Sequence, residues 1–141
     1  MTFSQEMAKE KDIPPSDRVV DERKKTILIY SPDLNFCFSL SILFQDRFSV
    51  ITTTNADMLE TFVAHYSADL VIVDAVPSDD IIEKLDALKR LNKSLPIIVL
   101  YVYSPKDVQL DRMIRGHVDS VFYKPFDVSA VSKRIEELLP Q

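Results

Sequence analysis

The stretch Ala-Asp-Leu-Val-Ile-Val-Asp-Ala-Val-Pro, residues 68–77, decides the fold. Four consecutive apolar residues, three of them β-branched, run directly into the carboxylate of Asp74. An unbroken apolar run of this length is typical of a strand that is covered on both faces in a parallel sheet. Asp74 would then lie at the carboxyl end of the strand, where open α/β sheets bind ligands. An aspartate at this place can also simply begin a turn or cap the following helix.

The composition excludes several classes of protein. The chain has 141 residues and a net charge of −5 without a block of Lys and Arg, so we expect no nucleic acid partner. Cys37 is the only cysteine, which excludes an internal disulfide and fits a reducing, cytoplasmic location. No segment approaches membrane-spanning length, so we expect no membrane association. With Gly116 as the only glycine, the chain lacks the glycine-rich loops of Walker and Rossmann nucleotide sites.

Two regions of the chain differ in composition. Residues 1–24 are polar and charge-mixed and contain Pro14-Pro15, so we expect a largely disordered tail. Residues 25–141 alternate short apolar runs with segments of helical periodicity, and we expect them to form one domain.

Five apolar runs predict strands, and segments of helical spacing separate them. The predicted strands are 26–30, 48–53, 70–73, 96–102 and 120–123. The predicted helices are 34–44, 59–66, 79–89, 107–115 and 128–138, and in the fourth we expect Leu110, Met113 and Ile114 to face inward. Alternation of this kind forces parallel pairing with right-handed crossovers. The chain is therefore predicted to be an α/β protein with a doubly wound, five-stranded parallel sheet and five helices.

Several polar side chains follow the predicted strands. Because the carboxyl ends of parallel strands share one edge of the sheet, these residues should lie near one another. They are Ser31, Pro32 and Asp33 after the first strand, Asp74 after the third, Tyr101 near the end of the fourth and Lys124 after the fifth. A carboxylate and a lysine at one edge can form a structural ion pair or a site that handles a phosphoryl group.

The chain from about residue 25 to residue 139 resembles the receiver domain of bacterial two-component response regulators. Four motifs carry the resemblance: Ile27-Leu28-Ile29-Tyr30, the stretch 69–74, Leu95-Pro96-Ile97-Ile98-Val99-Leu100 and, most specific, Lys124-Pro125-Phe126. The resemblance implies a flavodoxin-like sheet with the strand order 2-1-3-4-5.

The resemblance also implies roles for individual residues. Asp74 matches the aspartate that accepts a phosphoryl group from a histidine kinase, and Lys124 matches the lysine that contacts this group. The family uses an acidic pair after the first strand to hold Mg²⁺, but Ser31 and Pro32 occupy these places. Only Asp33, one residue further, is acidic, so Asp33 and Asp74 are expected to form a weak Mg²⁺ site at best. We expect Asp74 and Lys124 to form a lasting ion pair instead.

The family's two switch positions are also altered. The Ser or Thr after the fourth strand is replaced by Tyr101, whose phenol would crowd the pocket or point away from it. The aromatic residue of the fifth strand is replaced by Val121. The resemblance is therefore to an atypical receiver, a pseudo-receiver, that lacks most of the phosphotransfer machinery.

These observations lead to one preferred function and two alternatives. We expect a receiver-like signalling module that acts by protein–protein interaction, with no enzymatic activity and no cofactor, and with little or no Mg²⁺-dependent phosphorylation. The partner would be a histidine kinase, another signalling protein or a second copy. Its docking face would include Tyr103, Leu110, Met113 and Phe122, although half-buried core residues would show the same pattern. The alternatives are a functional phosphoacceptor that uses Asp74 and a flavodoxin-like enzyme or cofactor binder.

Overall fold

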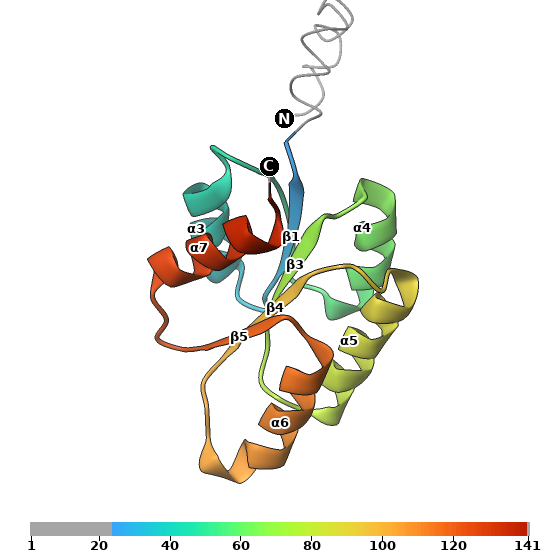
Figure 1. Ribbon diagram of the computed structural model, residues 1–141, viewed down its shortest axis with the longest axis vertical. Coiled ribbons are helices and arrows are strands. Elements are labelled where there is room, and N and C mark those ends of the chain that lie inside the picture. The colour runs from blue at the N-terminus through green and yellow to red at the C-terminus, as the bar shows by residue number, and fades with distance from the viewer. Residues whose placement is uncertain (1–23, 141) are drawn as a thin grey trace, which may run out of the picture.

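The structure is a computed structural model, and it describes residues 24–140. Five parallel strands form one sheet in the order β2-β1-β3-β4-β5, of which Figure 1 labels β1, β3, β4 and β5. The strands are β1 Thr26–Tyr30, β2 Ser49–Thr53, β3 Leu70–Asp74, β4 Ile97–Tyr101 and β5 Ser120–Tyr123. The predicted flavodoxin-like, doubly wound fold is confirmed. The tail predicted at residues 1–24 lies, except for Lys24, outside the described residues.

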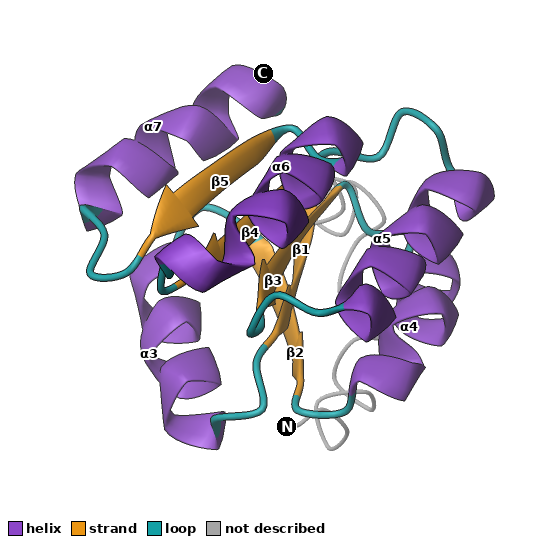
Figure 2. Cartoon of the chain, turned by 90° about the horizontal axis from the view of Figure 1, so that it is seen from below, coloured by secondary structure: helices purple, strands orange, loops and turns teal. Residues whose placement is uncertain are grey.

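Five α-helices of the described chain cover both faces of the sheet. They are α3 Leu34–Phe44, α4 Leu59–Tyr66, α5 Asp79–Leu91, α6 Val108–His117 and α7 Val128–Leu138, with short 3₁₀ turns at η1 Ala56–Met58 and η2 Pro105–Asp107. Helices α3 and α7 lie on one face, and α4, α5 and α6 lie on the other (Figures 1 and 2). This three-layer arrangement explains why β3 and β4 are buried along their whole length.

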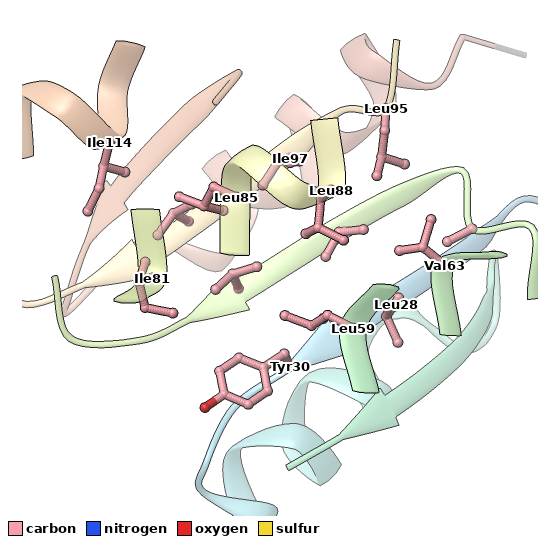
Figure 3. Close-up of a cluster of buried hydrophobic side chains, with 14 of the residues drawn as sticks. Leu28, Tyr30, Leu59, Val63, Ile81, Leu85, Leu88, Leu95, Ile97 and Ile114 are labelled. Carbon is pink, nitrogen blue, oxygen red and sulfur yellow. The ribbon is translucent and has the colours of Figure 1, made fainter. Parts of the chain in front are cut away.

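The core consists of two clusters of buried side chains, one on each side of the sheet. Figure 3 shows the cluster under α4, α5 and α6, in which Leu28, Ile97 and Leu85 are each 1% exposed or less. The second cluster lies under α3 and α7 and includes Ile29 and Phe44. Successive residues of a strand point to opposite faces, so each central strand contributes to both clusters.

The helix starts show which residues act as caps. Ser78 caps α5, because its hydroxyl accepts the backbone N–H of Ile81 at 3.1 Å. Asp74 therefore does not cap the helix that follows β3. It is the last residue of the strand and is only 6% exposed. This burial leaves the carboxylate at the edge of the sheet to make other contacts.

One predicted helix face is wrong. Met113 on α6 is 46% exposed, although we expected it to face inward with Ile114. The inner face of α6 is formed instead by Asp111 and Ile114, three residues apart, and this turns Met113 towards solvent. No helix within residues 24–140 has both the length and the apolar character that crossing a membrane requires.

Candidate functional site

Three side chains from distant parts of the chain meet at the carboxyl edge of the sheet. The Asp74 carboxylate ends β3, and its Oδ1 forms an ion pair with Lys124 Nζ after β5. Its other oxygen, Oδ2, accepts a hydrogen bond of 2.7 Å from the Ser31 hydroxyl after β1. Ser31 is fully buried, whereas the Lys124 side chain is 30% exposed. Both oxygens of the carboxylate are thus engaged by side chains of the protein itself.

Ser31 also fixes the turn that joins β1 to α3. Its Oγ accepts the backbone N–H of Asp33 at 3.0 Å, and its own N–H donates to the carbonyl of Thr53 at 3.2 Å. The Asp33 carboxylate in turn caps α3, because its Oδ1 accepts the N–H groups of Asn35 at 2.9 Å and Phe36 at 3.4 Å. Asp33 is therefore engaged at the helix start, and its role as a weak Mg²⁺ ligand stays a prediction.

Lys124 is held from two sides. Its ammonium lies 4.6 Å from the centre of the Phe36 ring, a cation–π distance. Phe36 packs edge-on against Phe126, with 6.2 Å between the ring centres. The backbone N–H of Lys124 donates to the carbonyl of Tyr101 at 2.9 Å, which extends the β4–β5 ladder beyond β5. These contacts direct the lysine towards Asp74.

Tyr101 belongs to a separate network that links β4, β5 and α6 and is buried at Tyr101 and Asp111. Its hydroxyl donates to Asp111 Oδ1 at 2.5 Å, and the hydroxyl of Tyr123 donates to the same oxygen at 2.8 Å. Arg115 donates from Nη2 to the Tyr123 hydroxyl at 2.7 Å, and its Nε lies 3.4 Å from Asp111 Oδ2. The phenol of Tyr101 is thus directed to α6, and its hydroxyl is bound to Asp111 instead of Asp74.

The network holds its members in definite charge states. Burial is the main cause that raises the pKa of Tyr101, and the hydrogen bond to Asp111 raises it further. For Asp111 burial acts to raise the pKa, but the hydrogen bonds from Tyr101 and Tyr123 and the charge of Arg115 outweigh it and lower the pKa. At neutral pH the network therefore contains a charged Asp111 carboxylate and a neutral Tyr101.

A hollow of about 270 Å³ opens beside Asp74. The loops after β3, β4 and β5 form its walls, and its lining includes Asp74, Pro77, Tyr101, Ser104 and Lys124. Tyr101, at the altered switch position, forms part of the lining, while its hydroxyl is bound to Asp111. Asp74 and Lys124 are the charged side chains that line the hollow.

The remaining predicted site residues do not form one surface. Val121, at the altered switch position, packs against the cluster under α6. Tyr103 and Met113 are 39% and 46% exposed, and Leu110 is half-buried. Phe122 packs against the cluster on the opposite side of the sheet, beneath α3 and α7. Phe122 therefore lies on the other side of the sheet from Met113, and a docking face that includes both stays a prediction.

Asp111, Arg115 and Tyr123 were not among the predicted site residues. One pattern in the sequence does point to Asp111. It lies three residues before the apolar Ile114 and four before Arg115, so a helix places an acid on its inner face beside a cation. Within residues 24–140 there is no group of three or more His, Cys, Asp and Glu side chains that could hold a metal ion.

Comparison with known proteins gives a consistent result for the fold. No protein-family model matches the sequence, and no curated protein matches it. Among solved structures, the N-terminal signal receiver domain of a two-component response regulator from Bacteroides fragilis is similar. The two are 21% identical with a TM-score of 0.70, over 84% of this chain and 98% of that one.

Two further structures broaden the comparison. A response regulator receiver modulated diguanylate cyclase from Pelobacter carbinolicus is 26% identical, with a TM-score of 0.67 over 82% of this chain and 92% of that one. A pilus assembly protein from Burkholderia thailandensis is 20% identical, with a TM-score of 0.68 over 83% of this chain and 99% of that one. The chain therefore has the fold of receiver domains, which occurs in proteins of different overall roles.

Proposed function

We propose that this chain is a receiver-like signalling module that acts by binding another protein, with little or no Mg²⁺-dependent phosphorylation of Asp74. Support for the signalling role comes from the receiver fold together with an aspartate and a lysine that meet at the carboxyl edge of the sheet. We further propose that the module has no enzymatic activity and no cofactor of its own.

The proposal rests on one observation: side chains of the protein already bind both oxygens of the Asp74 carboxylate. One oxygen is paired with Lys124, and the other accepts the hydroxyl of Ser31 at 2.7 Å. Mg²⁺ prefers oxygen ligands and usually takes one or two carboxylates in proteins. Here Asp33 caps α3, and Pro32 has no donor atom in its side chain. We infer that these residues do not fit Mg²⁺, whose charge would have to offset the repulsion between a carboxylate and an incoming phosphoryl group.

The partner surface that we propose lies on α6 and the loop after β4. Tyr103 and Met113 expose apolar surface there, and Leu110 lies half-buried on the same helix as Met113. The buried hydrogen bond of 2.5 Å from the Tyr101 hydroxyl to Asp111 joins this helix to β4. The partner would be a histidine kinase, another signalling protein or a second copy of the chain.

Phosphorylation can be tested directly by intact mass spectrometry. The full chain is incubated with Mg²⁺ and a small phosphodonor, and we expect no phosphate adduct. A variant with Ser31→Asp and Pro32→Asp restores two carboxylates next to Asp74, and we expect it to gain an adduct. The same variant with Asp74→Asn controls for phosphorylation elsewhere. A stoichiometric adduct on the unmodified chain that disappears in Asp74→Asn would overturn the proposal.

A second candidate function is that of a working phosphoacceptor. The hollow of about 270 Å³ that Asp74 and Lys124 help to line supports it, because it offers a negatively charged group a place beside a cation. This function requires that the phosphoryl group displaces either Lys124 from Oδ1 or Ser31 from Oδ2 of Asp74. The adduct measurement separates the two candidates.

A further inference from the structure

The segment that contains α6 and the loop after β4 is basic, although the chain as a whole is acidic. Residues 102–117 hold three Lys or Arg residues and two Asp residues, so their net charge is +1, whereas the whole chain has −5. Of the two acids, Asp111 is only 8% exposed and is bound by Tyr101 and Tyr123. The other, Asp107, is half-buried. The surface of this segment therefore presents mainly its cations.

Two arginines and two apolar residues form a surface on this segment, which we call the basic flank. Val108, Arg112 and Arg115 are four and three residues apart, so they lie on one face of α6. Arg115 donates a hydrogen bond of 2.7 Å to the hydroxyl of Tyr123, and the ring of Tyr103 lies 5.2 Å from the ring of Tyr123. The basic flank consists of Tyr103, Val108, Arg112 and Arg115, and it lies beside β5 (Figure 2).

The two arginines of the basic flank differ in how they are held. The guanidinium of Arg115 lies 5.1 Å from the centre of the Tyr123 ring and 3.4 Å from Asp111, yet the side chain is 47% exposed. Arg112 is exposed and forms no ion pair with another residue of the range 24–140. A cation that is already fixed loses little side-chain freedom when a ligand binds. A guanidinium can bind a carboxylate through two parallel hydrogen bonds.

We propose that the basic flank binds an acidic segment of the partner protein, in which carboxylates alternate with apolar side chains. The carboxylates would pair with Arg112 and Arg115. The apolar side chains would cover Tyr103 and Val108, which are 39% and 40% exposed. Complementary charge is what selects such a segment. This inference rests on the proposed function, which puts the partner surface on α6 and the loop after β4, and it adds the chemistry of the partner.

The hollow between α4 and α5 has the opposite character. Its volume is about 790 Å³, and its lining contains five acidic residues but only two basic ones, Lys84 and Arg90. Lys84 is already paired with Asp57 and Glu60. An acidic segment would meet like charges in this hollow. We therefore assign the segment to the basic flank and take the control variant from the hollow.

The test is fluorescence anisotropy on the full chain with a labelled peptide in which Glu and Asp alternate with Leu and Phe. We expect saturable binding that weakens between about 100 and 500 mM NaCl, because salt screens pairs of exposed charges. Arg112→Gln should raise the dissociation constant about threefold, the effect of one exposed ion pair, and Tyr103→Ala should raise it as well. Arg90→Gln is the matched control, because Arg90 is also exposed and without an ion pair within residues 24–140. It should leave binding unchanged.

Four results would overturn the proposal. One is the absence of binding at about 1 mM peptide, which lies at the weak end of specific association. Another is an equal effect of Arg112→Gln and Arg90→Gln, which would reflect only the net charge of the chain. The third is equal affinity for a peptide with Gln and Asn in place of Glu and Asp, and the fourth is tighter, Arg112-dependent binding of a single-stranded oligonucleotide.

The peptide readout does not involve phosphorylation of Asp74. A chain that gains no phosphate adduct and does not bind the acidic peptide would contradict this inference alone. A chain that gains the adduct but binds the peptide through Arg112 would contradict only the proposed lack of phosphorylation.

Discussion

Removing the charge of Lys124 should destabilise the fold, because it strands a buried carboxylate. In Lys124→Met the stem of the side chain is kept, but Asp74, 6% exposed, retains only the hydrogen bond from Ser31. Breaking a fully buried ion pair costs about 3–5 kcal/mol, and an exposed pair contributes about 0–1 kcal/mol. Because the Lys124 side chain is 30% exposed, we place the cost between these limits. We expect a loss of about 2 kcal/mol in the free energy of unfolding, including the contact with Phe36.

Urea unfolding followed by far-UV circular dichroism measures this loss. Lys133→Met on α7 removes an exposed lysine and should change the unfolding free energy by less than about 0.5 kcal/mol. Combining Lys124→Met with Asp74→Asn removes both charges, so the double variant should be more stable than Lys124→Met alone. An unfolding free energy for Lys124→Met within about 0.5 kcal/mol of the wild-type value would refute the reasoning.

Three further predictions concern the hydroxyl groups and the pH. Ser31→Ala should cost about 1–3 kcal/mol in urea unfolding, because Asp74 Oδ2 loses its donor, and an unchanged midpoint would contradict this role. Tyr101→Phe should cost about 1.5–3 kcal/mol through the lost bond to Asp111, whereas Tyr103→Phe, exposed on the surface, should be neutral. The lowered pKa of Asp111 stabilises the fold above the unfolded value of 3.8, and this stabilisation should disappear as the pH falls below it. The raised pKa of Tyr101 stabilises the fold below the unfolded value of 10.0, so stability should fall as the pH rises above it. Tyr101→Phe should flatten the alkaline change in thermal unfolding, and an identical profile would speak against the network.

The sheet could be predicted because its strands are buried on both faces. Apolar runs such as 70–73 leave few alternatives, and their alternation with helices dictates parallel pairing and one shared edge. That shared edge is why Asp74, Lys124 and Ser31 could be placed near one another. The mutual contacts themselves depend on side-chain directions, which the pattern of the sequence does not specify.

The spacing of Asp111 and Arg115 points to Asp111, but the contacts of its network could not be predicted, for a physical reason. A charged residue on a helix is usually solvated, and Asp111 is satisfied inside by Arg115 together with two tyrosines at the ends of β4 and β5. The face of Met113 was misjudged for a related reason. A shift of one residue along the chain moves a side chain to another side of the helix or strand. When a polar residue such as Asp111 takes the inner position, the pattern of apolar residues alone does not show which residues face inward.

The most direct measurement of the central claim is a Mg²⁺ titration followed by backbone amide NMR. If Ser31 and Lys124 engage the carboxylate of Asp74 as the structure has it, the amide signals of residues 31, 33, 74–76 and 124 should not move at millimolar Mg²⁺. In the variant with Ser31→Asp and Pro32→Asp, the same signals should shift and saturate. Saturable shifts at these residues in the unmodified chain, lost in Asp74→Asn, would contradict the account.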